Sequence, residues 1–205
     1  MLIMGRFELK KLESGERFKL DKSFGLNNIR VELTWGGSDL DLQVWLLNSD
    51  GVIVNDEGFV FYNSVNRSEP FDRVKFGNRA NWLKNTRPMS ADGAVLGSKD
   101  MVDGGIEISN IDLSKVAPEV QEIAISATVY EESENFGTVS SAKVAIIDED
   151  SQEQLCCYEL SNQYSSETAC VAGRFVINDE GDWEFVAEGK AYVGGLNTLV
   201  EMFAE

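Results

Sequence analysis

The sequence predicts an all-β fold, an antiparallel two-sheet β-sandwich with one short C-terminal helix. About ten short apolar or alternating segments follow one another at regular spacing, with turn-forming residues between them. A helical period occurs only near the C-terminus, where Leu196, Leu199, Val200 and Phe203 fall at i, i+3, i+4 and i+7. Since 43% of the 205 residues are hydrophobic and no linker is evident, we expect one domain over residues 1–205.

The first part of the chain carries the clearest strand patterns. Apolar and polar residues alternate over residues 28–35, which predicts a strand with one buried and one wet face. Residues 42–47 are apolar on both faces, so we expect a central strand that is covered on both sides. The predicted strands here are residues 7–12, 17–20, 28–35, 42–47, 52–54 and 59–62.

The pattern dissolves over residues 64–105, where charges, glycines and Pro88 mix with isolated aromatic residues. So long an irregular segment in a compact domain is either functional or partly mobile, and its aromatic residues suggest that it packs down somewhere. Trp82 lies in this segment and is either a core residue or part of an exposed binding surface. The other tryptophans, Trp35, Trp45 and Trp183, are expected in the core.

Regular strand patterns return after residue 105. They predict strands at residues 106–113, 123–129, 144–146, 155–160, 169–177 and 183–186. Acidic and glycine-containing turns separate them, including residues 148–151 and the hairpin turn at 178–181.

The charge balance and the lack of histidine limit the binding partners and catalytic classes that are open to this protein. There are 35 acidic and 18 basic residues and no histidine, for a formal charge of −17. This charge opposes binding to nucleic acid or an anionic membrane and favours cations or a basic protein surface. The lack of histidine removes Ser-His-Asp and Cys-His catalysis and His-ligated zinc. With no signal-peptide run and no stretch long enough to span a membrane, we expect a soluble, cytoplasmic protein.

The three cysteines, Cys156, Cys157 and Cys170, are an odd number, which argues against a disulfide framework. Cys156 and Cys157 would face opposite sides of a sheet, so they could not grip one metal together. We expect all three to be reduced.

Two aspartates spaced i, i+2 follow the glycine turn between the strands at 28–35 and 42–47. Asp39 and Asp41 would point the same way in extended chain and present two carboxylates at the lip of a buried sheet. This pair could bind a hard cation, or it could be solvated and bonded to the local backbone in an ordinary turn.

The chain resembles the TerD-like proteins of tellurite resistance and stress response. The resemblance lies in VELTWGGSDLDLQVWLL, FVFYN, IDLSKVAPEVQEI, NFGTVSSAKVAIID and GDWEFVAEGKAYVGGL, and so covers nearly the whole chain. It implies a calcium-binding β-sandwich without an established catalytic activity. The residues that match the family's calcium motifs are Asp39, Asp41 and Asn63.

The chain departs from the family pattern in the loop before IDL, where many relatives have a run of acidic residues. Only Asp100 and Asp103 remain as candidate ligands there, with Lys99 beside them. Gly58 also stands where an aspartate often precedes the FVFYN motif. We therefore expect part of the family's calcium site to be eroded and fewer ions to bind.

Two functions follow as hypotheses. The first is a non-catalytic calcium-binding module of tellurite resistance or general stress response, with a protein partner that is basic or belongs to the same resistance system. The alternative is a metal-independent acidic scaffold whose 64–105 segment and negative surface bind a basic protein. An enzyme is not expected, because Asp39 and Asp41 adjoin on one edge, which suits shared coordination better than opposed acid and base.

Overall fold

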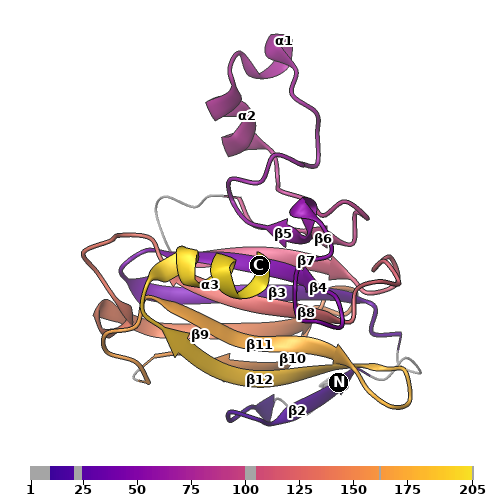
Figure 1. Ribbon diagram of the computed structural model, residues 1–205, viewed down its shortest axis with the longest axis vertical. Coiled ribbons are helices and arrows are strands. Elements are labelled where there is room, and N and C mark those ends of the chain that lie inside the picture. Colours follow the sequence, from indigo (N-terminus) through magenta and orange to yellow (C-terminus); the bar gives the residue numbers. More distant parts are fainter. Residues whose placement is uncertain (1–9, 21–24, 100–104, 162, 205) are drawn as a thin grey trace, which may run out of the picture.

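Two six-stranded sheets pack face to face in the computed structural model, which describes residues 10–20, 25–99, 105–161 and 163–204 (Figure 1). The first sheet has the order β1-β10-β9-β3-β7-β6 and the second the order β2-β12-β11-β8-β4-β5. Among the described strands, only β1 pairs in parallel, with β10. The predicted all-β antiparallel sandwich with a C-terminal helix is confirmed.

The strands of the first sheet are β1 (Lys10–Lys11), β10 (Glu153–Glu159), β9 (Val139–Asp148), β3 (Asn28–Gly37), β7 (Ile106–Asp112) and β6 (Val95–Leu96). Those of the second are β2 (Arg17–Leu20), β12 (Trp183–Tyr192), β11 (Ala169–Ile177), β8 (Glu122–Val129), β4 (Leu40–Leu47) and β5 (Phe59–Val60). The helices are α1 (Arg73–Phe76), α2 (Arg79–Asn85) and α3 (Gly195–Ala204), with 3-10 turns η2 (Asp56–Gly58) and η3 (Phe136–Thr138).

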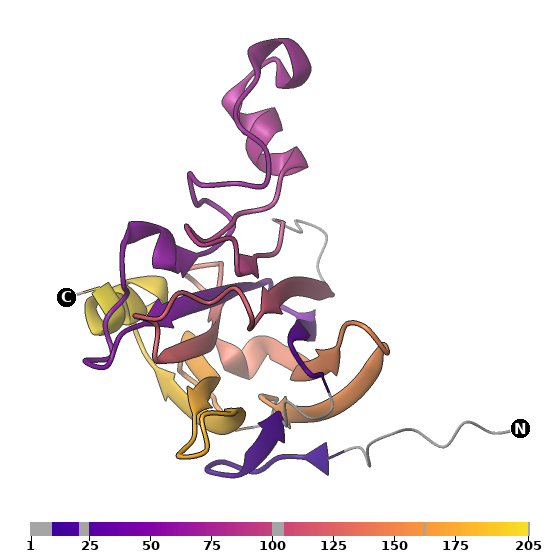
Figure 2. The same ribbon diagram turned by 90° about the vertical axis from the view of Figure 1, so that its right-hand side faces the viewer.

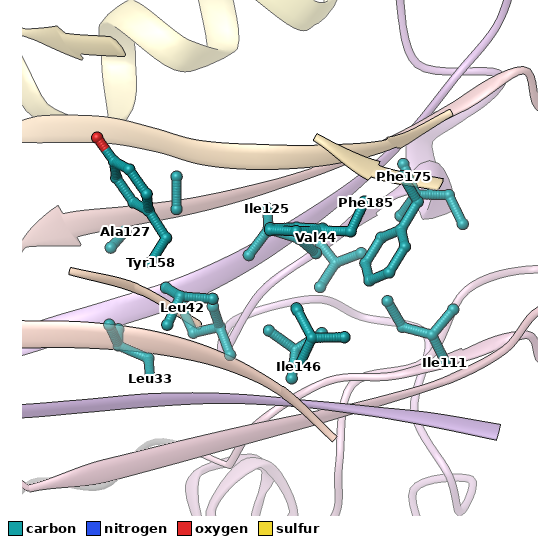
Figure 3. Close-up of a cluster of buried hydrophobic side chains, with 14 of the residues drawn as sticks. Leu33, Leu42, Val44, Ile111, Ile125, Ala127, Ile146, Tyr158, Phe175 and Phe185 are labelled. Atoms are coloured by element: carbon teal, nitrogen blue, oxygen red, sulfur yellow. The ribbon is translucent and has the colours of Figure 1, made fainter. Parts of the chain in front are cut away.

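The main core lies between the sheets. Figure 3 shows Leu33 and Ile146 of the first sheet facing Leu42, Val44 and Ile125 of the second, and all of these side chains are buried. Every residue of β4 is buried, which confirms that this strand is covered on both faces, but β4 lies beside the short edge strand β5 rather than at the centre of its sheet. Burial of this alternating apolar set supplies the main driving force for the two sheets to associate.

Helix α3 covers the outer face of the second sheet (Figure 1). Its Leu199 and Phe203 pack on Trp45, whose ring stacks on Phe59 at a centroid distance of 3.8 Å. Trp45 is therefore buried as predicted, but under α3 rather than between the sheets, where Trp35 and Trp183 lie. Among the described residues, no helix is long and apolar enough to cross a membrane.

The predicted strands at 52–54 and 59–62 are wrong in extent. Only one isolated bridge, Leu47 to Ile53, forms in the first, flanked by bonds from the Asn48 N–H to the Val52 carbonyl and from the Val54 N–H to the Leu46 carbonyl, because the 3-10 turn η2 follows at Asp56. The second shortens to β5, because a turn beyond Val60 closes when the Ser64 N–H donates to the Phe61 carbonyl at 3.0 Å.

Residues 67–88, which we call the arm, project from the sandwich beyond β5 and β6 (Figures 1 and 2). The prediction of an irregular segment is wrong in part, because the arm contains the short helices α1 and α2 within otherwise irregular chain. The Asp72 side chain caps α1 by accepting from the Val74 and Lys75 N–H groups, and Asn78 caps α2. Trp82 is only 4% exposed, so it is a core residue of the arm, whereas the tip of the arm lies away from the sheets.

Two arginines hold the base of the arm. Arg67 is 5% exposed and donates to the carbonyls of Tyr62, Ser64, Leu83 and Thr86 and to the Thr86 hydroxyl.

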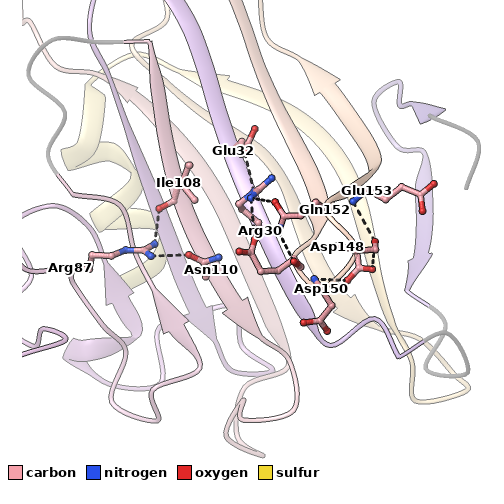
Figure 4. Close-up of polar contacts among 11 residues, drawn as sticks. Arg30, Glu32, Arg87, Ile108, Asn110, Asp148, Asp150, Gln152 and Glu153 are labelled. Atoms are coloured by element: carbon pink, nitrogen blue, oxygen red, sulfur yellow. Dashed lines mark hydrogen bonds and ion pairs between the residues drawn. The ribbon is translucent and has the colours of Figure 1, made fainter. Parts of the chain in front are cut away.

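Arg87 connects the arm to the first sheet by donating to the Ile108 carbonyl at 2.9 Å and to Asn110 Oδ1 at 2.8 Å (Figure 4). Burial lowers the pKa of the guanidinium groups of Arg67 and Arg87 from the ordinary value. The hydrogen bonds that both arginines donate fix where the arm leaves the sandwich.

All three cysteines are free and buried. Cys156 lies in the main core and Cys157 in a small cluster on the other face of the sheet, as their adjacent positions predict. Burial raises the pKa of the Cys156 thiol, and it raises that of Cys170 to about 12. Deprotonation at these sites is therefore disfavoured across the neutral range.

We expect a thiol reagent to label none of the cysteines rapidly in the native protein and all three after denaturation. Raising the pH from about 7 to about 9 should not accelerate native labelling of Cys156 or Cys170, because their thiolates form only near their raised pKa values. Mass spectrometry of the labelled chain gives the count. Fewer than three labels after denaturation would contradict the expectation of reduced thiols.

Candidate functional site

The start of β4 carries the predicted aspartates. Gly37 ends β3 with φ +89° and lies so close to η3 that a Cβ there would be 2.4 Å from the Thr138 carbonyl oxygen. Only glycine fits this close approach, and it lets the chain turn directly into β4. Asp39 is half-buried in the turn, and its carbonyl accepts from the Tyr130 N–H at 3.0 Å. Asp41 is only 7% exposed and lies opposite Thr128 of β8.

A row of buried polar side chains leads along the outer face of the second sheet to Asp41. The indole N–H of Trp45 donates to Ser126 Oγ, which donates to Gln43 Oε1, each at 2.8 Å. The Gln43 amide nitrogen then donates to Thr128 Oγ1 and to the Asp41 carbonyl. The side chains of Gln43, Ser126 and Thr128 are at most 2% exposed, so this network fixes the backbone on which the Asp41 carboxylate is carried.

Glu107 brings a carboxylate from the first sheet to the same end of β4. It is 3% exposed on β7, and its Oε2 accepts from the Leu42 N–H at 2.7 Å. Strand β5 pairs with β4 only at Val44 and Trp45, so Glu107 supplies the acceptor where strand pairing has ended. No local signal in the sequence marks Glu107. Ile106 and Ile108 on either side predict that it faces outward, whereas the structure buries it and exposes Ile106.

The other predicted ligands are less closely grouped. Asn63 is exposed and lines a pocket of about 300 Å³ with Asp56, Glu57 and Ser64, a different pocket from the one Asp41 lines. Asp100 and Asp103 lie outside the described residues. Within the part of the chain that the structure describes, no three Asp, Glu or Cys side chains form a group that could hold a metal ion.

Asp41 lies in the wall of a groove of about 480 Å³, which we call the α3 groove. The turn before α3 forms one side, where Thr168 Oγ1 accepts from the Gly195 N–H at 2.8 Å. The other side contains Tyr62 and Tyr130, whose rings meet edge to face at 6.4 Å. The groove is lined by Asp41, Tyr62, Thr128, Val129, Tyr130, Glu131, Glu132, Thr168, Val193, Gly194, Gly195, Leu196 and Asn197.

Comparison with known proteins shows what the chain is similar to. The TerD domain model matches residues 9–203. General stress protein 16U of Bacillus subtilis (strain 168) is 32% identical over 201 residues, covering 90% of this chain and 92% of that protein. The tellurium resistance protein TerD of Serratia marcescens is 28% identical over 207 residues, covering 94% and 95%. A crystal structure of a homologue of telluride resistance protein (TerD) from Streptomyces coelicolor A3(2) has the same fold, with a TM-score of 0.61 and 18% identity over 87% of this chain and 96% of that one.

Proposed function

The chain belongs to the TerD domain family, and from that premise we propose that it is a non-catalytic, cytoplasmic calcium-binding module of tellurite resistance or general stress response. The names of two relatives, a general stress protein and a tellurium resistance protein, support the biological role. The observation that supports calcium binding is that carboxylates from two different sheets are both held at the start of β4. Asp41 is carried there on a buried network, and Glu107 reaches the same strand from the opposite sheet.

The donor chemistry at this end of β4 suits calcium. Ca²⁺ takes six to eight oxygen ligands from carboxylates, amides, backbone carbonyls and water at flexible geometry. Asp39 and Asp41 would be the first ligands, with Glu107 as a further carboxylate. Because no three acidic side chains among the described residues form a metal-binding group, backbone carbonyls of the neighbouring loops and water would have to complete the set. Asp100 and Asp103, in the loop beside Lys99, are expected to contribute little.

We expect Ca²⁺ to raise the thermal midpoint of unfolding and Mg²⁺ to raise it far less. A ligand that binds only the folded state stabilises it, by about 2.7 kcal/mol at a hundredfold excess over Kd. Mg²⁺ requires near-ideal octahedral geometry and dehydrates reluctantly, so carboxylates on a turn and two sheets suit it poorly. Thermal unfolding in chelator, Ca²⁺ and Mg²⁺ measures the effect. Equal shifts with both ions, or none with either, would refute a selective calcium site.

Four variants place the site. Asp41→Asn should abolish most of the calcium-dependent stabilisation, whereas Asp103→Asn should change it little, because Lys99 opposes a cation at that loop. Asn63→Ala tests the ligand suggested by the family motif, which lines a separate pocket. Asp50→Asn, in the exposed turn after β4, is the matched control. Calorimetric titration measures calcium binding by all four variants. Loss of binding in Asp103→Asn but not in Asp41→Asn would show that the site lies in the loop before β7 and not at the start of β4.

The alternative is a metal-independent acidic scaffold that binds a basic protein. The specific observation in its favour is that the described carboxylates form no group of three, while the chain carries a net charge of −17. The calcium titration separates the two hypotheses, because the scaffold predicts no difference between chelator and Ca²⁺.

A further inference from the structure

The arm is basic in an otherwise strongly acidic protein. Residues 67–88 contain six basic and two acidic side chains, a net charge of +4, so the rest of the chain carries −21. Two of the basic residues, Arg67 and Arg87, are used at the base. The other four are exposed on α1 and α2. They are Arg73, Lys75, Arg79 and Lys84.

The tip of the arm combines this charge with exposed apolar surface. Val74 is 98% exposed on α1, between Arg73 and Lys75, and Phe71 just before it is 41% exposed. Lys75 forms an ion pair with Glu69 but keeps more than half of its side chain exposed. A fully exposed valine between two cations is a surface suited to a partner that offers both carboxylates and apolar contacts.

The α3 groove has the complementary chemistry. Its lining includes Glu131 and Glu132, which are exposed, and none of its lining residues is basic. Its apolar contacts come from Tyr130 and Val193, which are 55% and 68% exposed. Carboxylates beside exposed aromatic and aliphatic surface therefore match Arg73, Val74 and Lys75 in both charge and polarity.

The two surfaces of one molecule lie apart. The hydrogen bonds of Arg67 and Arg87 fix the base of the arm at the β5 and β6 edge. From there α1 lies at the far end of the arm from both sheets, whereas the groove adjoins the start of α3 on the sandwich (Figures 1 and 2). The arm therefore presents α1 outward, to another molecule.

We propose that α1 of one copy of this chain docks in the α3 groove of a second copy. The charge of −21 outside the arm favours such a protein surface over nucleic acid or an anionic membrane, which the same charge would repel. The interface joins two different surfaces, so it is heterologous. Such contacts form a ring if the rotation closes and an open chain if it does not. None of Arg73, Lys75, Glu131 and Glu132 is a candidate calcium ligand, but Asp41 also lines the groove. Self-association is therefore measured in chelator, so that its failure is distinguishable from failure of the calcium proposal.

Sedimentation velocity over a range of protein concentrations tests the proposal. The wild type should associate reversibly, and association should weaken when the ionic strength rises from about 0.05 to about 0.5 M, because salt screens exposed charges. Arg73→Glu with Lys75→Glu, and separately Glu131→Lys with Glu132→Lys, should each weaken association at least about tenfold. Asp50→Lys with Glu119→Lys, which makes the same charge change at exposed positions outside the groove, is the control and should not weaken it.

A fourfold variant that combines the two arm and the two groove substitutions tests whether α1 and the groove contact each other, because its acidic α1 would again face a basic groove. It should recover most of the lost association, and equimolar mixing of the two double variants should produce hetero-association. Circular dichroism and thermal unfolding verify that each variant folds. A monomeric wild type at low salt, an effect of the control equal to that of the groove variant, or no recovery in the fourfold variant would each overturn the proposal. So would a monomeric wild type whose arm binds polyglutamate, which would assign the arm to another acidic protein.

Discussion

Arg67→Met is expected to lower the free energy of unfolding by about 3–5 kcal/mol, because it removes a buried cation whose donors all have partners. Arg67 donates five hydrogen bonds, four of them to backbone carbonyls that converge from both ends of the arm. Methionine can fill much of the volume but leaves these acceptors without a donor. Denaturant unfolding measures the loss. Limited proteolysis should show cleavage within residues 67–88 at a protease concentration that the wild type resists.

Two variants separate charge from geometry at this position. Arg67→Lys keeps the positive charge but has one ammonium in place of the planar fork, so it should recover less than half of the loss. Arg73→Met, on exposed α1, removes a cation outside the buried cluster and should change stability by at most about 0.5 kcal/mol. If Arg67→Met and Arg73→Met destabilised the protein equally, the hydrogen bonds at the base would not be what holds the arm.

Local sequence predicts the sandwich well because alternation is set by burial. Strand β11 begins and ends where the pattern predicts, and β4 is buried throughout, as its apolar residues on both faces require. The apolar residues 52–54 do not themselves show that this strand shortens to one bridge, because the 3-10 turn η2 that follows at Asp56 ends it.

The arm could not be predicted from periodicity. Helices α1 and α2 have four and seven residues, too few to show an amphipathic period. The signals that mark them are the caps, Asp72 and Asn78, and the glycine between them at Gly77. Arg67 carried no local signal, because its partners are carbonyl groups brought together only by the fold.

The sequence predicts only part of the candidate site, because residue spacing reports local relations and not tertiary contacts. Spacing placed Asp39 and Asp41 together at the start of a buried strand, and the structure places both there. Spacing could not place Glu107, which comes from the opposite sheet, or separate Asn63 from the pocket that Asp41 lines. These relations depend on tertiary contacts between segments that are far apart in the chain.

Glu107→Ala is expected to lower the free energy of unfolding by about 2–4 kcal/mol in the absence of calcium. The substitution leaves the buried Leu42 N–H without its acceptor and opens space near the start of β4, and both effects destabilise a packed interior. Hydrogen exchange at the Leu42 amide gives a local measurement. Its protection should fall by more than that of the Leu46 amide, since β4 is otherwise paired along its length with β8.

Glu107→Gln separates the structural role of this residue from a role in calcium binding. Its amide oxygen can still accept from the Leu42 N–H, so stability in chelator and Leu42 protection should stay within about 1 kcal/mol of the wild type. The lost charge should nevertheless weaken calcium-dependent stabilisation, because Ca²⁺ affinity rises with the number of charged ligands. Glu119→Gln, at an exposed position on the loop before β8, is the matched control and should alter neither quantity. If Glu107→Gln binds calcium as the wild type does while Glu107→Ala loses stability, Glu107 is a structural acceptor and the calcium ligands lie elsewhere.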